Sequence, residues 1–289
     1  MTASPARVAL VTGASRGAGR GIARQLGATG ATVYVTGRTD RAGSATLPGS
    51  LAETVSEIDA AGGRGIAVVC DHSRDDDVRA LVDRIGEESG RLDILVNNAF
   101  AVPDGLVAPK PFWEKSLDLL QMLDVGLRST YVASALCAPL MIGSPERAPL
   151  VVNTSGFGGG CYVHGPLYGA VKAGVDKMAH DMAVDFKPWN VTAISLWMGL
   201  LRTERTAVTL AGDPDRYGKD GEVMESPDFI GRVVAAFDAL PDKLERSGSV
   251  LVASELGLEL GVVDLDGATP ASRRPRLGGP PEYNDAVLY

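Results

Sequence analysis

Short apolar runs alternate with longer amphipathic stretches along the whole chain. Runs rich in β-branched residues and followed by a glycine or polar turn predict strands, and apolar residues at helical spacing predict the helices between them. The predicted strands cover residues 7–12, 32–36, 65–70, 92–96, 150–153, 191–196 and 249–252. The predicted helices cover residues 17–29, 51–61, 75–88, 112–141, 168–186 and 226–240. Such alternation indicates an α/β protein with a mainly parallel seven-stranded sheet and helices on both faces.

Two segments depart from this alternation. Residues 204–225 are polar with glycine and proline breaks, which suits either a lid that closes over substrate or an ordinary surface loop. Residues 268–289 carry several prolines and little apolar periodicity, so we expect an irregular C-terminal extension after a domain that spans residues 1–267.

Composition narrows the classes of function. The 289 residues include 28 Lys+Arg and 36 Asp+Glu, which gives a net charge of −8 and argues against a nucleic-acid partner. The chain has no run of 18 apolar residues and no readable secretory signal, so we expect no membrane partner. The three cysteines are scattered, which fits a reducing cytosol and a cytoplasmic protein. His72, His164 and His180 share no ligand-like spacing, so no metal site is predicted.

A glycine-rich turn, Thr12–Gly19, lies between the first predicted strand and the first predicted helix. Glycines let a backbone approach a pyrophosphate, and a helix N-terminus supplies free N–H groups and a positive dipole end. Any strand-to-helix turn can need glycine, so a plain tight turn is the alternative. The context of strand, turn, helix and second strand favours a dinucleotide site.

The end of the second predicted strand bears on the choice of dinucleotide. An acidic residue there would hold a ribose 2′-hydroxyl, but this chain has Gly37 followed by Arg38. Arg38 and Arg16 together suit a 2′-phosphate, because a guanidinium offers planar paired donors. Two solvated arginines on a loop rim are the alternative. NADP(H) is therefore favoured, with NAD(H) as the other candidate.

A proton-transfer set follows the fifth predicted strand. Tyr168 and Lys172 are four residues apart on a predicted helix and so share a face, and Ser155 lies thirteen residues upstream. A nearby ammonium lowers the pKa of a phenol, and a serine hydroxyl can hold the substrate oxygen while the tyrosine exchanges a proton with it. Tyr-x-x-x-Lys also occurs by chance on protein surfaces, so the pair gains its weight from its position in a dinucleotide-binding fold.

Over about residues 6–260 the chain resembles the short-chain dehydrogenase/reductase family. The matching positions are Thr12–Gly19, Asp71, Asn97–Ala99, Ser155, Tyr168, Lys172, Gly199 and Thr203. Further stretches, among them GRTD, PFWE, DVGLRSTYVAS and SLWMGLLRTE, are similar to one branch of that family.

The resemblance implies one doubly wound Rossmann domain with NAD(P) along the carboxyl ends of the strands. It implies Tyr168 as general acid/base, Lys172 as ligand of the nicotinamide ribose, and Ser155 as the group that orients the substrate carbonyl. The expected cofactor-binding residues are Gly13, Ser15, Arg16, Gly17, Ala18, Gly19, Arg38, Asp71, His72, Asn98, Ala99, Tyr168, Lys172, Gly199, Leu201 and Thr203. Asp71 would contact adenine, Asn98 the adenine-side ribose region, and Thr203 the carboxamide or pyrophosphate. The predicted helices 112–141 and 168–186 would form the interface of a homodimer or homotetramer.

Four positions depart from the family pattern. Gly126 stands where the family usually has an asparagine that shapes a water-linked proton path from the lysine. Phe100 replaces a glycine after Asn97–Ala99, Met198 replaces a proline, and Ala18 stands where isoleucine is frequent. The proton path is therefore in question, and Phe100 and Met198 are expected to reshape the nicotinamide end of the pocket.

Aromatic and apolar residues near the carboxyl ends of the predicted strands suggest an apolar substrate pocket with few charges. The expected pocket residues are Phe100, Trp113, Phe157, Tyr162 and Met198. Core or loop packing is the alternative for several of them, and for Trp197 above all. Two functions remain: an NADP-dependent reductase or dehydrogenase that interconverts a small apolar carbonyl and its alcohol, or a catalytically weak nucleotide-sensing or scaffold protein on the same fold.

Overall fold

Seven parallel strands form one sheet in the computed structural model, which describes residues 6–43, 46–212, 224–284 and 286–288. The strand order is β3-β2-β1-β4-β5-β6-β7. The strands are β1 Val8–Val11, β2 Thr32–Gly37, β3 Arg64–Val69, β4 Ile94–Asn97, β5 Leu150–Gly156, β6 Thr192–Met198 and β7 Val250–Val252. The predicted sheet and its number of strands are confirmed.

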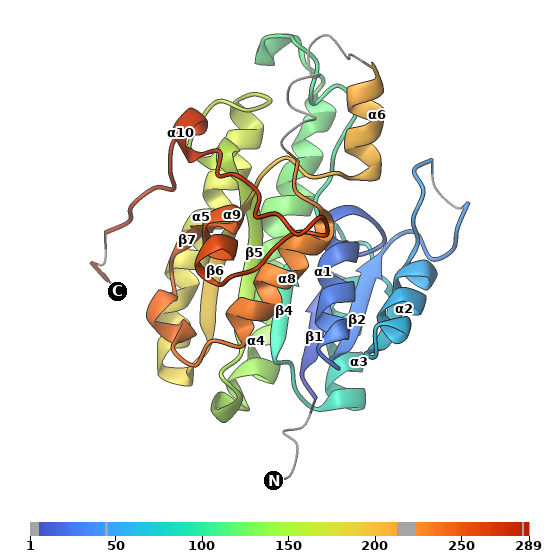
Figure 1. Cartoon of the computed structure of the whole chain (residues 1–289), viewed down its shortest axis with the longest axis vertical. Helices are drawn as coiled ribbons and strands as arrows, with labels where there is room; N and C mark the ends of the chain where they lie inside the picture. Colours follow the sequence, from blue (N-terminus) through green and yellow to red (C-terminus); the bar gives the residue numbers. More distant parts are fainter. Residues whose placement is uncertain (1–5, 44–45, 213–223, 285, 289) are drawn as a thin grey trace.

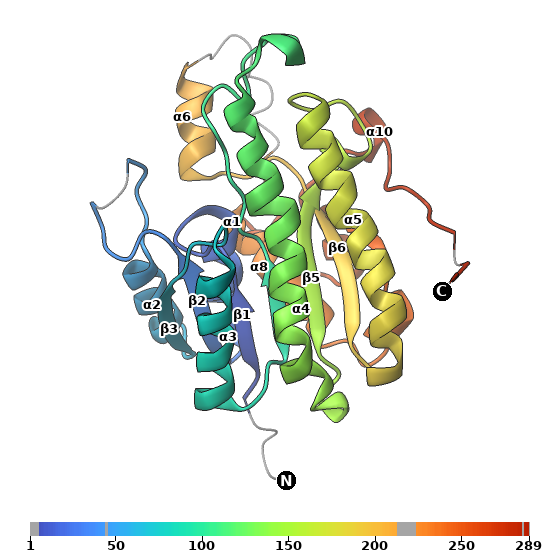
Figure 2. The same cartoon turned by 180° about the vertical axis from the view of Figure 1, so that it is seen from behind.

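Helices cover both faces of the sheet. The helices are α1 Gly17–Ala28, α2 Leu51–Ala60, α3 Asp75–Ser89, α4 Ser129–Ile142, α5 Pro166–Phe186, α6 Glu204–Gly212, α8 Pro227–Asp238, α9 Ala253–Glu259 and α10 Arg274–Leu277. Figure 1 looks onto α1, α2, α8 and α9, and Figure 2 onto α3, α4 and α5. Alternate strand residues feed the two layers: Ala9 and Val11 pack on the first side, Val8 and Leu10 on the second.

The chain reverses its direction across the sheet between β1 and β4. From β1 it builds outward through β2 to β3, then returns to place β4 on the other side of β1. The loops that follow β1 and β4 therefore diverge and leave a crevice at the carboxyl ends of the strands. In open α/β sheets this is where ligands bind.

The prediction of one long helix over residues 112–141 is wrong for the first half of that range. Phe112–Glu114 and Leu117–Leu120 are separate 3₁₀ turns, and a π-helical segment spans Leu123–Arg128. The backbone leaves helical geometry at Val125 and at Gly126, where φ is +154°. Residues that carry a side chain rarely adopt this backbone conformation, so the glycine permits the kink. The regular helix α4 begins only after it.

By length and composition alone, Leu117–Ile142 is apolar enough to cross a membrane, with a mean hydropathy of 1.3. Helices that cover the core of a soluble protein meet the same criterion. In this fold Ala133, Cys137 and Met141 are buried in the layer between α4 and the sheet, so packing within the protein accounts for the apolar residues on that side.

The described parts of the two segments that the sequence singled out both contact the domain. Residues 204–212 of the expected lid form α6, whereas residues 213–223 lie outside the described residues. The C-terminal extension contains α10 and is otherwise irregular where described. Arg274 pairs with Glu255 of α9, and Leu277 packs against Phe157 and Trp197, so the extension docks on the domain.

Candidate active site

The glycine turn after β1 has the close approaches that a phosphate cradle requires. Gly13 has φ +66°, and a Cβ there would lie 2.8 Å from the Cα of Ala99. Gly17, with φ +58°, directly begins α1. A Cβ on Gly19 would meet the carbonyl oxygen of Gly13 at 2.5 Å. The turn accordingly brings bare backbone and a helix N-terminus to the crevice, which suits a pyrophosphate.

The turn is fastened to the end of β4. The Thr12 hydroxyl accepts hydrogen bonds from the backbone N–H groups of Asn98 (2.8 Å) and Ala99 (2.9 Å). The Asn98 side-chain amide donates to the carbonyls of Thr12 (2.8 Å) and Gly13 (3.1 Å). Asn98 was expected near the adenine-side ribose, but its side-chain amide holds the glycine turn in place. A local sequence pattern could not show this contact, because it joins segments that are 85 residues or more apart.

Arg38, Asp71 and His72 meet at the ends of β2 and β3. Arg38 is exposed. Burial opposes the ionisation of Asp71, but hydrogen bonds from Ser73, helped by the charge of Arg38, hold the pKa of Asp71 below its ordinary value. His72 is buried, which lowers its pKa to about 4, so the ring is neutral at pH 7. Its Nε2 lies 2.7 Å from the Thr36 hydroxyl, while Nδ1 is buried with no hydrogen-bond partner among the described residues.

Arg16 was expected to bind a 2′-phosphate together with Arg38, but most of its donors are already used within the protein. Its guanidinium donates to the backbone carbonyls of Leu47 (3.2 Å), Pro48 (2.9 Å) and Gly49 (2.9 Å). Arg16 thereby secures the loop before α2 and lines the cleft with a partly buried side chain, whereas the side chain of Arg38 at the cleft is exposed. Only the folded loop brings those carbonyls, more than thirty residues away, to Arg16.

One cleft of about 570 Å³ joins these groups. It runs from Arg38, Asp71 and His72, past Gly13, Ser15, Arg16, Gly17 and Ala18, to Asn98, Ala99, Phe100 and Thr203. The bare glycine backbone, the exposed guanidinium and the unpartnered His72 Nδ1 fit an NAD(P) molecule laid across the sheet.

Ser155, Tyr168 and Lys172 come together where β5 ends and α5 begins. Ser155 is buried and donates to the backbone carbonyl of Lys172 (3.3 Å). The Lys172 ammonium is also buried; it donates to the carbonyl of Thr154 (3.4 Å) and lies 5.8 Å from the centre of the Tyr168 ring. The spacing of four residues places both side chains on the face of α5 toward β5. The structure brings the predicted proton-transfer set into one place.

Burial dominates the ionisation of this pair. It raises the pKa of Tyr168 to about 12 and lowers the pKa of Lys172 to about 8. Both shifts favour the neutral forms, because each charge would lie in a medium of low polarity. The phenol is therefore protonated at neutral pH and available as a proton donor.

A buried carboxylate that sequence reasoning missed lies one helical turn beyond Lys172. Asp176 accepts hydrogen bonds from the Ser195 hydroxyl (2.6 Å) and from Trp197 Nε1 (2.9 Å), and also hydrogen-bonds Ser155. Burial raises the pKa of Asp176, and those hydrogen bonds and Lys172 oppose the rise. Its position four residues after Lys172 was a signal available in the sequence.

The five expected substrate residues do not line a common pocket. Trp113 and Tyr162 are 72% and 77% exposed, respectively. Phe157 is 6% exposed and packs on Trp197, while Met198 packs against the core beneath the sheet. Phe100 alone faces the cofactor cleft. Apolar character predicts burial or a pocket, but the direction of each loop decides where the side chain goes.

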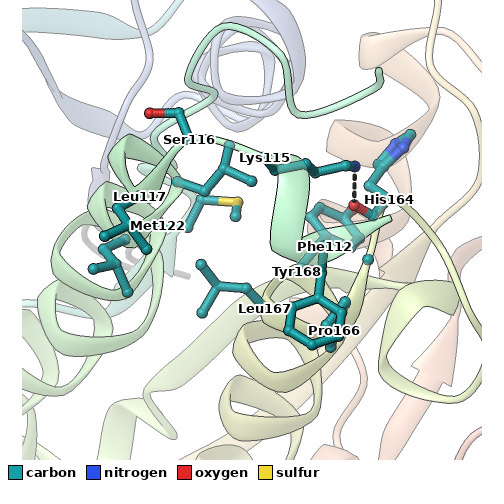
Figure 3. A pocket seen from close by; sticks show the side chains of 12 residues that line it. Phe112, Lys115, Ser116, Leu117, Met122, His164, Pro166, Leu167 and Tyr168 are labelled. Atoms are coloured by element: carbon teal, nitrogen blue, oxygen red, sulfur yellow. Dashed lines mark hydrogen bonds between the residues drawn. The ribbon is translucent and has the colours of Figure 1, made fainter. Parts of the chain in front are cut away.

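An apolar cavity of about 120 Å³ instead lies beside Tyr168 (Figure 3). Leu117 and Met122 approach it from one side and Leu167 from the other. Lys115 spans its edge and donates to the carbonyls of Leu106 (2.7 Å) and His164 (2.8 Å). The ring of His164 packs edge-on against Tyr168, with centroids 5.2 Å apart. His164 is thus partly buried at the site.

The segment after β6 approaches the glycine turn. Gly199 donates its backbone N–H to Glu225 (2.9 Å), and the chain at Leu201 pairs with Glu225. Thr203 lies over Gly17, and Glu204 accepts a hydrogen bond from the Gly17 N–H (3.1 Å). The expected residues Gly199, Leu201 and Thr203 therefore form one strip, and Thr203 within it borders the cleft.

Comparisons with known proteins agree with this geometry. A family model described as short chain dehydrogenase matches residues 7–213. The chain is 38% identical to Dehydrogenase/reductase SDR family member 1 of Mus musculus over 272 residues, which cover 90% of this chain and 84% of that protein. The identity to the Homo sapiens protein of the same name is 36%, with the same coverage. A short chain dehydrogenase from Mycobacterium thermoresistibile superposes with a TM-score of 0.74 at 25% identity, over 90% of this chain and 89% of that one.

Proposed function

The chain belongs to the short-chain dehydrogenase/reductase family of oxidoreductases, and from that premise we propose that it interconverts a carbonyl and an alcohol with NADP(H). The observation that carries this proposal is the convergence of Ser155, Tyr168 and Lys172 beside a cleft shaped for a dinucleotide. When bound, the nicotinamide supplies or accepts the hydride. The protein's own residues handle the proton.

Tyr168 acts as the general acid in the direction of reduction. Its pKa of about 12 keeps the phenol protonated, and proton transfer to the forming alkoxide completes the alcohol. Lys172, whose pKa of about 8 leaves it largely charged at pH 7, stabilises the resulting phenolate. The Ser155 hydroxyl orients the carbonyl oxygen. In oxidation the same groups act in reverse.

NADP(H) is the proposed cofactor because Gly37 supplies no acid and Arg38 stands exposed at the cleft. A 2′-phosphate would gain a charge-assisted bidentate contact from the Arg38 guanidinium. The remaining donors of Arg16 lie close by, since the charge of Arg38 contributes to lowering the pKa of Arg16, in which burial is the larger cause. NAD(H) is the alternative that titration decides.

The proposed substrate is small and largely apolar. The cavity beside Tyr168 is walled by Leu119, Met122 and Leu167. Its volume of about 120 Å³ is somewhat below the roughly 150 Å³ of a cavity that binds benzene, so it suits an apolar group no larger than about one ring. A charged substituent in this cavity would lose its hydration. Among the described residues, the one charged side chain that lines the cavity is Lys115, and its ammonium already donates to two carbonyls.

We also propose a cytoplasmic homodimer or homotetramer. Cys70, Cys137 and Cys161 are free thiols, which suits a reducing compartment. The outer faces of α4 and α5 lie side by side (Figure 2), and Tyr131 of α4 is 61% exposed there. Pairing of these faces about a two-fold axis would cover that ring.

The test is a panel of ketones and aldehydes with NADPH consumption as the readout. At least one small apolar carbonyl should be reduced by the wild type and not by Tyr168→Phe. Failure of every substrate, with NADPH still bound, would favour the alternative of a catalytically weak nucleotide-sensing protein. The specific observation behind that alternative is Gly126, which lies in the kink before α4 where the family usually has the asparagine of the proton path.

A further inference from the structure

Phe100 is placed between the cofactor cleft and the Tyr168–Lys172 pair. It follows β4 directly and borders the cleft. Its ring meets the Tyr168 ring edge-on, with centroids 5.9 Å apart, and the Lys172 ammonium lies 4.4 Å above the centre of its face. No other described residue contacts cleft, phenol and ammonium in this way.

The ring also fills the space above Gly126. A Cβ at Gly126 would lie 2.8 and 2.9 Å from two carbons of the Phe100 ring, closer than packed side chains tolerate. Gly126 is buried within the π-helical kink, and kinks of this kind frequently occur at functional sites. Two departures from the family pattern, Phe100 and Gly126, are therefore one feature: the bare backbone makes room for the ring.

We propose that Phe100 is a positioning residue, which holds the Lys172 ammonium on its ring face and closes the space over Gly126 to water. The proposal rests on the proposed function, in which Tyr168 and Lys172 form the acid–base pair. A cation over the face of an aromatic ring is attracted by the ring's negative face, more strongly when the site is dry. Simple packing would need only an apolar side chain of this size, and it would leave the charge of Lys172 unaffected.

The groups that face Lys172 are few and come from three directions. On α5 they are Tyr168 and Asp176; the charge of Asp176 raises the pKa of Lys172 against burial. From β5 come the carbonyl of Thr154 and the neutral Ser155 hydroxyl. From the loop after β4 comes the Phe100 ring, and the kink contributes only the Gly126 backbone beneath that ring. Loss of the ring face therefore removes one of the few contacts that favour the charged amine.

The experiment compares Phe100→Leu with the matched control Phe186→Leu, which makes the same change at a buried phenylalanine at the far end of α5. The readouts are the pH dependence of kcat/KM and, separately, the pH dependence of NADPH affinity. Loss of a cation–π contact should move the alkaline limb of both profiles to lower pH by about 0.4–1.5 pH units. Phe186→Leu should leave both limbs in place.

A second variant guards against misfolding of Phe100→Leu. Site-specific replacement of Phe100 by trifluorophenylalanine keeps the shape of the ring and weakens its negative face, so the limb should move in the same direction. An unmoved limb in the trifluorinated protein overturns the proposal, and so does an equal shift in Phe186→Leu. If the wild type reduces no carbonyl, the proposed function fails, while NADPH affinity against pH still tests Phe100.

Discussion

Glu204 accepts a hydrogen bond from the backbone N–H of Gly17, with Oε2 and N 3.1 Å apart. Gly17 is the first residue of α1, so its N–H is one of the free donors that a pyrophosphate would use. Glu204 is the first residue of α6, so the contact holds the start of that helix against the glycine turn. A carboxylate at a helix N-terminus is electrostatically favourable by itself, which makes the side chain a competitor of the cofactor.

Glu204→Gln should bind NADPH more tightly than the wild type. Glutamine can still accept the hydrogen bond, but it has no charge to interact with the helix dipole or repel the pyrophosphate. The dipole contribution of about 0.3–1 kcal/mol corresponds to a roughly two- to five-fold lower Kd. Fluorescence titration measures it. The exposed acid Glu114, changed to Gln, is the control, and an unchanged or weaker affinity in Glu204→Gln contradicts the competition.

Arg38→Ala should weaken NADPH binding and leave NADH binding nearly unchanged. A lost charge-assisted contact with the 2′-phosphate costs about 1.5–3 kcal/mol, or roughly 10- to 150-fold in Kd. Arg41→Ala, three residues further along the same loop, serves as control. Tighter binding of NADH than of NADPH by the wild type would rule out the proposed preference.

Tyr168→Phe should abolish turnover while NADPH affinity stays nearly intact. Phenylalanine keeps the ring against Phe100 and His164 and removes only the hydroxyl. Positioned acid–base catalysis contributes about 10²- to 10⁴-fold, so the loss of kcat should be at least that large. Tyr162→Phe, at an exposed ring, is the control. Retention of most activity in Tyr168→Phe would require a different acid.

Lys172→Ala should differ from Tyr168→Phe by lowering both kcat and cofactor affinity. The ammonium is proposed to serve the ribose and the phenolate at once. Steady-state kinetics with the substrate found in the panel, combined with NADPH titration, separates the two effects. A variant that loses rate but keeps full NADPH affinity would remove Lys172 from the ribose site.

Glu225 should make the free energy of unfolding fall as pH rises. Burial raises its pKa from 4.5 to about 7, against the hydrogen bond from Gly199. The folded state then binds the proton more tightly than the unfolded state, so this stabilisation is complete below about pH 4.5 and is lost as pH rises through 7. The difference is on the order of 3 kcal/mol.

Urea unfolding of wild type and Glu225→Gln at pH 5 and pH 8 tests this relationship. The amide can keep the acceptor for Gly199 and cannot ionise, so the variant should lose less stability between the two pH values. Glu259→Gln, at an exposed carboxylate, controls for surface charge. Parallel losses in Glu225→Gln and wild type would show that Glu225 is not the group responsible.

Light scattering at micromolar concentration should give the mass of a dimer or tetramer. Tyr131→Glu, on the outer face of α4, should shift the assembly toward monomers, because it would place a charge where two apolar faces meet. Val69→Glu, an exposed apolar position on β3 away from these helices, is the control. A monomeric wild type would contradict the proposed pairing.

Local patterns were sufficient for the sheet and for much of the site. The strands could be located because both faces are covered, so each appears as a short β-branched run ending at a turn. The glycine turn at Gly13–Gly19 and the four-residue spacing of Tyr168 and Lys172 are likewise local properties. Parallel strands carry such loops to the same edge, so the convergence of the two motifs followed from the alternation of elements.

Contacts between distant segments decided the rest. Helical spacing continues through residues 112–141, yet the Phe100 ring occupies the space above Gly126 and a kink interrupts the helix there. Arg16 is held by carbonyls of the loop before α2, and Glu204 reaches Gly17 across 187 positions of the sequence. Periodicity records which face of an element is buried. It contains no information on which remote side chain meets that face, because the meeting depends on loop paths that the packed sheet and helices determine.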